Sequence, residues 1–519
     1  MAVVLVDAAK AKPNEIAIRD SSLTMTWAEL NSAINRVVNN LKPRDLGPNR
    51  RIAVYAENSL ETALAHMAAL HAGLSSVPVN FHLNAEEAAY ILNDSGTRLL
   101  FTGPENLARA IDAVAQLSTP IPIVVWRASG ALPNGVESFE ALMASSSDAE
   151  PVDDVAPRPN MLYTSGTTGF PKGVDLPPTM FAGGTNIAEH IAVLATNRFA
   201  SLGVHIVVGP MYHTGPLSGV RILATGTPVV ILEKFDPERT LAKIQEFKAA
   251  SSVMVPTHFK RMLDLPADVR AKYDVSSMKM LSHTGAKCPV DVKKRMIEWF
   301  GPVFVDAYGA TEVGTVCSIT SQDWLTHPGS VGRVVNPPFT RCLVVDDDGN
   351  ELPANTEGRL FFEDATGRGI VYPNDPEKSA KAHLRPGVFT LGEIGYVDED
   401  GFVYITDRFS DMIVSGGVNI YPAEAEKVII EHPKVADVAV IGVPDPDMGE
   451  AVKALVVPID MNDAPTPEEL IVLCKSQLSG YKCPKTVDIV STVGRTAMGK
   501  INKRELRAPY WESGRTIGG

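Results

Sequence analysis

The fold is decided by the stretch YTSGTTGFPKG, residues Tyr163 to Gly173. It directly follows the apolar residues Met161 and Leu162 and combines glycines, hydroxyl side chains and Lys172. Glycine lets a backbone approach a ligand closely and adopt positive φ, and backbone amides, hydroxyls and a lysine all donate to phosphate. We therefore expect a strand that leads into a phosphate-binding loop. Taken alone, the string also fits an ordinary surface turn.

This loop is not a P-loop, because the GxxxxGK[ST] pattern is absent and Pro171 precedes Lys172. Pro177 and Pro178 follow closely, so no helix begins there as it does in a P-loop. The string resembles the phosphate loop of the adenylate-forming superfamily, which includes acyl-CoA synthetases, luciferases and peptide-synthetase adenylation domains. The resemblance implies ATP contacts from Thr164, Ser165, Gly166, Thr167, Thr168, Gly169 and Lys172, with Thr168 also close to the metal ion.

The sequence before and after this loop predicts layered α/β structure. Thr26 and Glu29 can form a capping box, after which Leu30, Ile34 and Val37 fall on one helical face. Similar helical runs alternate with short β-branched segments such as RIAVYA and IPIVVW. This alternation is expected when helices cover a largely parallel sheet.

The pattern changes after about residue 335. The segments RCLVVDDDGNELP and GYVDEDGFVYITDR are strands broken by Asp and Gly turns, which indicates hairpins. The last hundred residues or so predict a small α+β domain with a helix after Pro422 and another capped by Thr466. We predict an acyl-CoA synthetase-like fold: an N-terminal domain over residues 1–406, a hinge at 407–411 and a small mobile domain over 412–519.

A second string, DAYGATEVG, runs from Asp306 to Gly314 and resembles the family motif that serves the α-phosphate and magnesium. A carboxylate beside a hydroxyl in a glycine-bounded loop suits a hard cation that bridges phosphate oxygens. The resemblance assigns catalytic roles to Thr311 and Glu312, with Glu312 as a metal ligand. It also implies nucleotide contacts from Asp306, Ala307, Tyr308 and Gly309.

The string TLGEIGYVDEDGFVYITDR resembles the motif that ends the large domain. Glu393 stands where relatives usually have the Asp that holds the ribose hydroxyls, and Arg408 resembles an arginine that contacts ribose or phosphate. Glutamate keeps the acceptor oxygens but is one methylene longer, so it must shift the ribose or its own backbone. Ser410 occupies the hinge position, where relatives generally carry Asp or Lys.

Two strings in the last hundred residues or so resemble mobile parts of the family. The segment SGGVNIYPAEAE resembles a Gly-rich stretch that meets the pantetheine arm, which implies CoA contacts from Ser415, Gly416 and Gly417. The segment GRTAMGKINKREL resembles the one that bears the catalytic lysine, here Lys500. A lysine that bridges the acid and the α-phosphate offsets their repulsion. Gly494 replaces the family's usual proline, which should loosen this loop.

Three further strings carry weaker resemblances. HTGAKCP, around Gly285 and Ala286, resembles the segment beside adenine, and YKCPK implies CoA contacts from Tyr481 and Lys485. PMYHTG places His213 and Thr214 at the acyl pocket, together with Gly309 and Ala310. His213 fits a satisfied buried histidine equally well.

Composition is that of an ordinary globular protein, with 519 residues, 45% hydrophobic and 21% charged content. A net charge of −13 offers no broad positive field, so nucleic acid is not expected as a partner. Five cysteines without close pairing argue against a disulfide framework and for the reducing cytoplasm. The first residues lack a basic leader and a membrane-length apolar run, so we expect no transmembrane segment.

Together the motifs imply an AMP-forming acyl-CoA synthetase that uses ATP, Mg²⁺ and coenzyme A. A carboxylic acid is converted to an acyl-adenylate with release of pyrophosphate, and the acyl group then passes to CoA after the small domain rotates. An apolar or aromatic acid fits the small and apolar lining between Gly203 and Val220 best. Fatty, aryl and steroid-derived acids all remain open, as does a homodimer.

Two alternatives remain open from the sequence. One is an adenylation enzyme that passes the acyl group to a carrier protein or another nucleophile, although no Asp stands beside His213 to hold an amino-acid ammonium. The other is a non-catalytic nucleotide-binding relative, motivated by the departures at Glu393, Ser410 and Gly494. Pyrophosphate exchange and thioester assays separate them.

Overall fold

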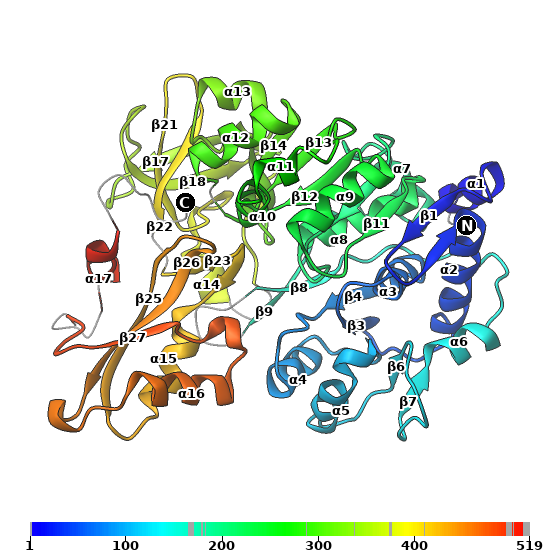
Figure 1. Cartoon of the computed structure of the whole chain (residues 1–519), viewed down its shortest axis with the longest axis horizontal. Helices are drawn as coiled ribbons and strands as arrows, with labels where there is room; N and C mark the ends of the chain where they lie inside the picture. Colours follow the sequence, from blue (N-terminus) through cyan, green and yellow to red (C-terminus); the bar gives the residue numbers. More distant parts are fainter. Residues whose placement is uncertain are drawn as a thin grey trace.

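The computed structural model describes residues 3–164, 171–177, 180–181, 183–286, 288–336, 338–372, 376–408, 411–494, 501 and 503–511. Of residues 3–6, 164, 378, 407 and 408 it describes the backbone alone. Figure 1 shows a large α/β body followed by a smaller domain that packs against it. None of the described helices combines the length and the apolarity that a membrane crossing requires.

The first sheet of the large body is parallel and carries helices on both sides, as the alternating pattern predicts. Its strands pair in the order β4–β3–β5–β6–β7. The strands are β3 (Arg51–Tyr55), β4 (Ser75–Pro78), β5 (Leu100–Thr102), β6 (Ile123–Val125) and β7 (Val136–Ser138). Its helices are α2 (Trp27–Leu41), α3 (Leu60–His71), α4 (Ala85–Asp94), α5 (Leu107–Ala115) and α6 (Phe139–Ser145).

The second sheet has nine strands in the order β16–β15–β14–β13–β12–β10–β11–β1–β2. They are β1 (Ile16–Arg19), β2 (Thr24–Thr26), β10 (His205–Val207), β11 (Val229–Ile231), β12 (Ser251–Met254), β13 (Met280–His283), β14 (Phe304–Ala310), β15 (Gly314–Thr320) and β16 (Arg333–Val334). The surrounding helices are α1 (Val3–Ala11), α7 (Ile187–Leu194), α8 (Thr214–Arg221), α9 (Pro237–Phe247), α10 (Pro256–Leu263), α11 (Ala267–Arg270), α12 (Val290–Phe300) and α13 (Ser321–Thr326). The centre of the sheet is parallel and consists of β1, β11, β10, β12, β13 and β14.

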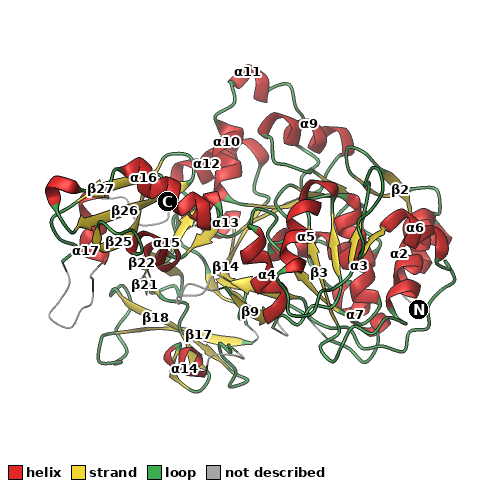
Figure 2. Ribbon diagram, turned by 90° about the horizontal axis from the view of Figure 1, so that it is seen from below, coloured by secondary structure: helices red, strands yellow, loops and turns green. Residues whose placement is uncertain are grey.

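Helix α3 lies in the core between these layers, because all of its residues are buried. Helix α2 packs beside it, and its start agrees with the sequence. Thr26 and Glu29 form the predicted capping box, and Leu30, Ile34 and Val37 are buried on the predicted face. Buried residues of both helices share one apolar core cluster with Ile52 and Val54 of β3, and Figure 2 shows both helices in the N-terminal part of the large body.

A β-rich subdomain follows, with the predicted hairpin between β21 (Glu393–Val397) and β22 (Val403–Arg408). The same sheet contains β17 (Phe339–Val345), β18 (Gly358–Asp364), β19 (His383–Arg385) and β20 (Val388–Phe389), beside α14 (Pro376–Lys381). A separate hairpin of β8 (Met161–Thr164) and β9 (Lys172–Asp175) lies beside β4 of the first sheet.

The small domain is the predicted α+β unit. Its sheet contains β23 (Ile413–Ser415), β24 (Val418–Ile420), β25 (Val435–Asp445), β26 (Gly449–Pro458) and β27 (Thr486–Ile489). Its helices are α15 (Pro422–Ile430), α16 (Pro467–Gln477) and α17 (Lys503–Arg507). Thr466 and Glu469 form the capping box of α16. The mixed α/β fold with a large and a small part is thereby confirmed, while the hinge at 407–411 stays a prediction.

Candidate active site

The phosphate-loop string is held at both ends by the β8–β9 hairpin. Thr164 pairs with Lys172 and Tyr163 pairs with Gly173 in an antiparallel register. The Tyr163 hydroxyl donates to Asp94 Oδ2 of α4 at 2.7 Å, which fastens the hairpin to the large body. Ser165, Gly166, Thr167, Thr168 and Gly169 lie outside the described residues. The predicted strand therefore leads into the string, and a second strand leaves it.

Thr311 and Glu312 lie in the turn between β14 and β15. Gly309 is required there, because a Cβ at this position would stand 1.9 Å from the Gly314 carbonyl oxygen. The backbone at Gly314 is thus too close to position 309 for any side chain to fit there. The Tyr372 hydroxyl donates to Glu312 Oε1 at 3.2 Å and orients that carboxylate. Tyr372 carried no signal in the sequence.

A buried polar cluster surrounds Asp306. His283 of β13 is opposite Asp306 of β14 in the sheet register, and its Nε2 lies 2.8 Å from Asp306 Oδ1. Lys293 of α12 contacts the other carboxylate oxygen and lies over the Trp324 ring, with its side chain 1% exposed. Burial opposes ionisation of Asp306, but His283 and Lys293 outweigh it and lower the pKa of this carboxyl. Asp306 is therefore a fixed carboxylate.

The sequence reasoning missed Lys293 and His283. Lys293 shares the α12 face with Met296, Ile297 and Phe300, at the spacing of a buried stripe. A lysine at such a position needs a buried acid as a partner. That signal was present in the sequence and would have indicated the pair with Asp306.

The ribose-site residues come together between two sheets. The Tyr308 hydroxyl of β14 donates to Glu393 Oε2 of β21 at 2.7 Å. Glu393 is also opposite Arg408 in the β21–β22 register. Burial, followed by the Glu393 charge, raises the pKa of Tyr308, so its hydroxyl stays protonated and remains a donor. Three residues predicted to contact the nucleotide therefore share one location.

The Gly-rich turn of the small domain touches the large body at this same end of the sheet. Gly416 and Gly417 connect β23 to β24, with φ of +59° and +83°. A Cβ on Gly417 would lie 2.9 Å from Val255 Cγ1, and a Cβ on Gly285 would lie 3.6 Å from the Gly417 carbonyl oxygen. The turn predicted for CoA thus meets the segment predicted for adenine. Ser415 pairs with Gly449 and is buried.

The other two predicted CoA residues, Tyr481 and Lys485, have different surroundings. The Tyr481 hydroxyl accepts from Asn80 Nδ2 of the large body at 3.3 Å, and burial raises its pKa to about 12. Lys485 Nζ forms an ion pair with Asp445 Oδ2 at 2.8 Å, and its side chain is about half exposed. Tyr481 therefore lies at the border of the two parts, whereas Lys485 faces partly toward water.

His213 and Thr214 begin helix α8, with His213 as its N-terminal flanking residue. Burial, followed by the nearby His82, lowers the pKa of His213 to about 4, so its imidazole is neutral at pH 7. Gly215 packs on β12, since a Cβ there would lie 2.9 Å from Val253 Cγ1 and 3.9 Å from Thr284 Cγ2. The start of α8 therefore adjoins the segment that carries Gly285 and Ala286.

Three predicted groups lie wholly or partly outside the described residues: Lys500, the hinge residue Ser410 and the Arg408 side chain. Val493 and Ile501, on either side of the Lys500 segment, pack in one apolar cluster of the small domain with Ile441. Ala307 and Ala310 lie on β14 between the residues already described. Among the described residues, no group of three or more His, Cys, Asp or Glu side chains forms a metal-binding cluster.

Comparison with known proteins decides the family. The model of the AMP-binding enzyme family matches residues 5–367, and that of the AMP-binding enzyme C-terminal domain matches residues 424–500. This chain belongs to the AMP-binding enzyme family. That membership confirms the adenylate-forming, acyl-CoA synthetase-like resemblance and the class of acid–thiol ligase, with ATP, Mg²⁺ and CoA as the small molecules used.

Two curated relatives match over almost the full length. A fatty acid–[acyl-carrier-protein] ligase, ScoC from Streptomyces coeruleorubidus, is 32% identical over 511 residues, covering 97% of this chain and 95% of the relative. A feruloyl-CoA synthase from Amycolatopsis sp is 32% identical over 513 residues, covering 97% of each chain. This AMP-binding enzyme is therefore similar both to a carrier-protein ligase and to a CoA ligase.

Two solved structures are similar over the full length but to different degrees. The amide bond synthetase McbA from Marinactinospora thermotolerans has a TM-score of 0.81 at 27% identity, with 98% of this chain and 99% of McbA covered. ATP-bound MatB from Rhodopseudomonas palustris has a TM-score of 0.63 at 28% identity, with 98% and 99% covered. Identity and coverage are nearly equal, so they do not explain the difference in TM-score.

Proposed function

We propose that this AMP-binding enzyme converts an apolar or aromatic carboxylic acid to its acyl-adenylate with ATP and then to its CoA thioester. The observation that carries this proposal is the contact of the Gly416–Gly417 turn with Gly285 and Val255. Because this turn has no side chains, its backbone comes close to the end of the sheet where the predicted nucleotide residues meet, and in this proposal it borders the thin pantetheine arm. Acid activation and thiol transfer then share one location.

On the nucleotide side, each residue has a defined task. Asp306, held by Lys293, fixes the part of β14 that borders the nucleotide, and Glu393 accepts from the ribose hydroxyls while Tyr308 donates to its Oε2. Lys172 and the loop before it bind the outer phosphates. Lys500 neutralises the charge that develops between the acid and the α-phosphate. Pyrophosphate leaves with the electron pair of the broken phosphoanhydride bond.

Glu312 would hold the magnesium ion, together with Thr168. The described residues contain one carboxylate at this turn rather than an acidic cluster. That donor set fits Mg²⁺, which keeps most of its ligands as water and phosphate oxygens and takes one or two carboxylates from the protein. When bound, the ion neutralises negative charge on the phosphates.

In the thiol-transfer step, the sulfur of CoA attacks the acyl carbonyl carbon and a carbon–sulfur bond forms. The bond between this carbon and the phosphate oxygen breaks, AMP leaves with its electron pair, and the thiol proton passes to solvent. Gly416, Gly417 and Tyr481 border the path of the arm in the orientation described here. The lower TM-score against ATP-bound MatB supports an orientation other than the ATP-bound one, because a single rigid superposition penalises domains that are arranged differently. We infer that this orientation is the one for acyl transfer.

Several finer features belong to the same proposal. The large domain ends at residue 406, residues 407–411 form the hinge, and the small domain begins at 412. We propose a cytoplasmic location, supported by five free cysteines, and homodimerisation. Acyl transfer to a carrier protein is the second candidate, favoured by the similarity to ScoC.

The test is product analysis with purified protein, Mg²⁺, ATP and a panel of fatty, aryl and steroid-derived acids. Each acid is tested with CoA, with a phosphopantetheinylated carrier protein and with neither thiol. We expect pyrophosphate release that depends on the acid, and AMP plus an acyl-CoA thioester when CoA is present. A thioester on the carrier protein alone would establish the second candidate. ATP binding without acid-dependent pyrophosphate release would contradict both.

A further inference from the structure

Lys482 is a buried cation at the border between the small domain and the large body. Its Nζ lies 2.7 Å from Glu87 Oε1 of α4 and 2.6 Å from Glu424 Oε2 of α15. The exposed fractions of the three side chains are 4% for Lys482, 13% for Glu87 and 5% for Glu424. Such pairs are uncommon in proteins unless both charges are satisfied, because each buried charge loses its water. This ion triad is therefore a defined feature of the border.

The triad is surrounded by further contacts between the same two parts. Ser479 Oγ donates to Glu87 Oε2, and Asn84 Nδ2 donates to the Gln477 carbonyl oxygen at 3.0 Å. Tyr481, next to Lys482 in the chain, accepts from Asn80. Figure 1 shows α4 and α16 facing each other at this border. The segment from Gln477 to Lys482 is thus the place where the small domain is attached to α4.

The two acids of the triad are in different parts of the molecule. Glu424 and Lys482 are both in the small domain, so their pair is retained when that domain moves as a unit. Glu87 belongs to α4, where its carboxylate also accepts from the Asn84 amide in a capping box. The Glu87–Lys482 pair is therefore the part of the triad that exists in one domain orientation alone. Burial favours neutral Lys482, but Tyr481, Glu424 and Glu87 outweigh burial and raise its pKa.

We propose that Glu87 and Lys482 are positioning residues of the thiol-transfer half-reaction, because their ion pair holds the small domain where Gly417 meets Gly285. The inference rests on the proposed two-step function and names a pair that acts in its second step alone. During acid activation the pair opens, Lys482 stays with Glu424, and Glu87 returns to water and its capping role. The stability of this pair therefore sets how much of the enzyme is ready for the thiol.

Glu87→Gln is the sharpest variant for this proposal. Glutamine at the third helical position also completes a capping box, so α4 keeps its N-terminal cap while the charge toward Lys482 is lost. Ser479 keeps an amide oxygen as its acceptor. The change leaves the Lys482–Glu424 pair untouched, so the small domain keeps its own buried pair. Loss of folding is not expected from this variant.

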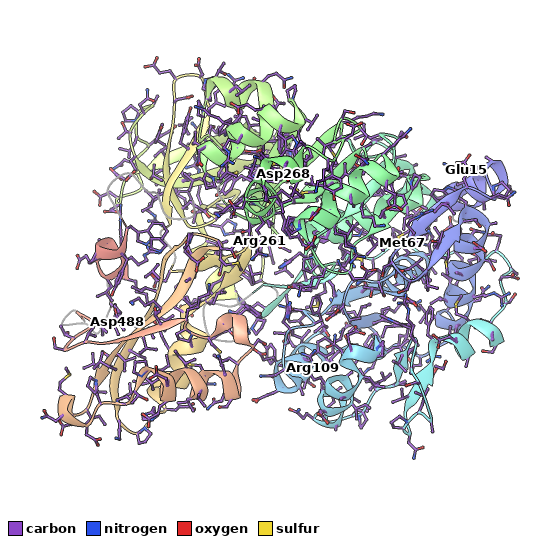
Figure 3. The ribbon with its side chains drawn as sticks, in the orientation of Figure 1. Glu15, Met67, Arg109, Arg261, Asp268 and Asp488 are labelled. Atoms are coloured by element: carbon purple, nitrogen blue, oxygen red, sulfur yellow. The ribbon has the colours of Figure 1, made fainter. Side chains whose placement is uncertain are left out.

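Arg261→Gln is the matched control. Arg261 of α10 forms an ion pair with Asp447 of the small domain at 2.7 Å, so it crosses the same border (Figure 3). Its side chain is 40% exposed and that of Asp447 is 48% exposed. Exposed pairs contribute little because water screens both charges. We expect a change of less than about twofold in either half-reaction for this variant.

The experiment measures the half-reactions separately in the full-length protein. Acid-dependent ATP–pyrophosphate exchange without CoA reports the first step, and thioester formation from supplied acyl-adenylate and CoA reports the second. For Glu87→Gln we expect exchange within about twofold of the unchanged enzyme and thioester formation reduced about tenfold, with a raised KM for CoA. The unchanged enzyme is assayed in parallel, and its failure in both assays would refute the proposed function rather than this inference.

Two results would overturn the inference. An equal loss in both half-reactions would show a general structural role for Glu87. Unchanged thioester formation would show that the pair does not hold the transfer orientation. A second variant, Glu87→Asp, keeps the charge but shortens the reach by one methylene group. Its rate of thioester formation should lie between the rates of Glu87→Gln and the unchanged enzyme, and its pyrophosphate exchange should not change. A rate of thioester formation as low as that of Glu87→Gln would also support a role for the Glu87–Lys482 pair.

Discussion

The proposed site has a side for the nucleotide and a side for the thiol, and the two sides are built in different ways. His283, Asp306 and Tyr308 lie on neighbouring strands whose register places them, and Lys293 and Glu393 hold them from buried positions. Gly417 and Tyr481 instead reach the site from the small domain, across a border held by separate contacts with the large body, among them the Lys482–Glu87 pair. The first arrangement depends on the fold itself, whereas the second depends on how the small domain is docked. Substitutions should therefore separate the two half-reactions.

The largest separation is expected for Lys500→Ala. The lysine offsets repulsion between two anionic reactants in the first step, and removal of one such stabilising group typically costs about 10²- to 10³-fold in rate. Acid-dependent pyrophosphate exchange should fall by that amount, while thioester formation from supplied acyl-adenylate should stay within about threefold. Equal losses of pyrophosphate exchange and thioester formation would contradict a role for Lys500 in the first step alone.

Glu312→Gln should produce the next largest effect. The amide is a weaker ligand for Mg²⁺ than the carboxylate, although Tyr372 can still donate to its oxygen. Pyrophosphate exchange should fall about 10²-fold at low magnesium and recover in part when magnesium is raised. A titration of the exchange rate against magnesium concentration checks this, and an unaltered magnesium dependence would argue against Glu312 as a ligand.

Gly417→Ala adds a single carbon atom, Cβ, on the proposed thiol side of the site. Its φ is +83° and the new Cβ would stand 2.9 Å from Val255 Cγ1, at the contact between the two parts. Thioester formation should fall about tenfold while pyrophosphate exchange is retained. Gly401→Ala is the control, because Gly401 has a φ of +82° but no atom within 4 Å of the added Cβ. Similar losses in both variants would attribute the effect to backbone strain.

The smallest effect is expected for Tyr308→Phe. This change removes the hydroxyl that donates to Glu393 at 2.7 Å but keeps the ring in place. A hydrogen bond to a charged group contributes about 1.5–3 kcal/mol, part of which water can replace here. The KM for ATP in pyrophosphate exchange should rise about threefold, with thioester formation from acyl-adenylate unchanged. No change in KM would indicate that Glu393 does not depend on Tyr308.

Local patterns in the sequence were sufficient to predict most elements. The capping boxes at Thr26 and Thr466, the hairpin around Asp398 and the helix after Pro422 all occur where the residues indicate them. These features depend on neighbouring residues, so a single sequence contains the necessary information. The order of the motifs likewise predicted the family that the comparisons confirm.

The pairs that cross between elements could not be predicted in the same way. Glu87 and Lys482 are 395 positions apart, and nothing near either residue indicates the other. Glu393 and Tyr308 meet because two sheets pack together, which also explains how the longer acid at the ribose position is held. Asp306 and Lys293 are the exception, since a lysine within a buried helical stripe already calls for an acid.

In the proposed reaction, this protein joins a carboxylic acid to AMP before any thiol is involved. The most direct measurement is exchange of labelled pyrophosphate into ATP by the purified enzyme with Mg²⁺ and a panel of carboxylic acids, in the absence of CoA. Exchange that appears with an acid and is absent without one is the predicted result. Exchange that never responds to an acid, or that begins when CoA is added, would contradict the account.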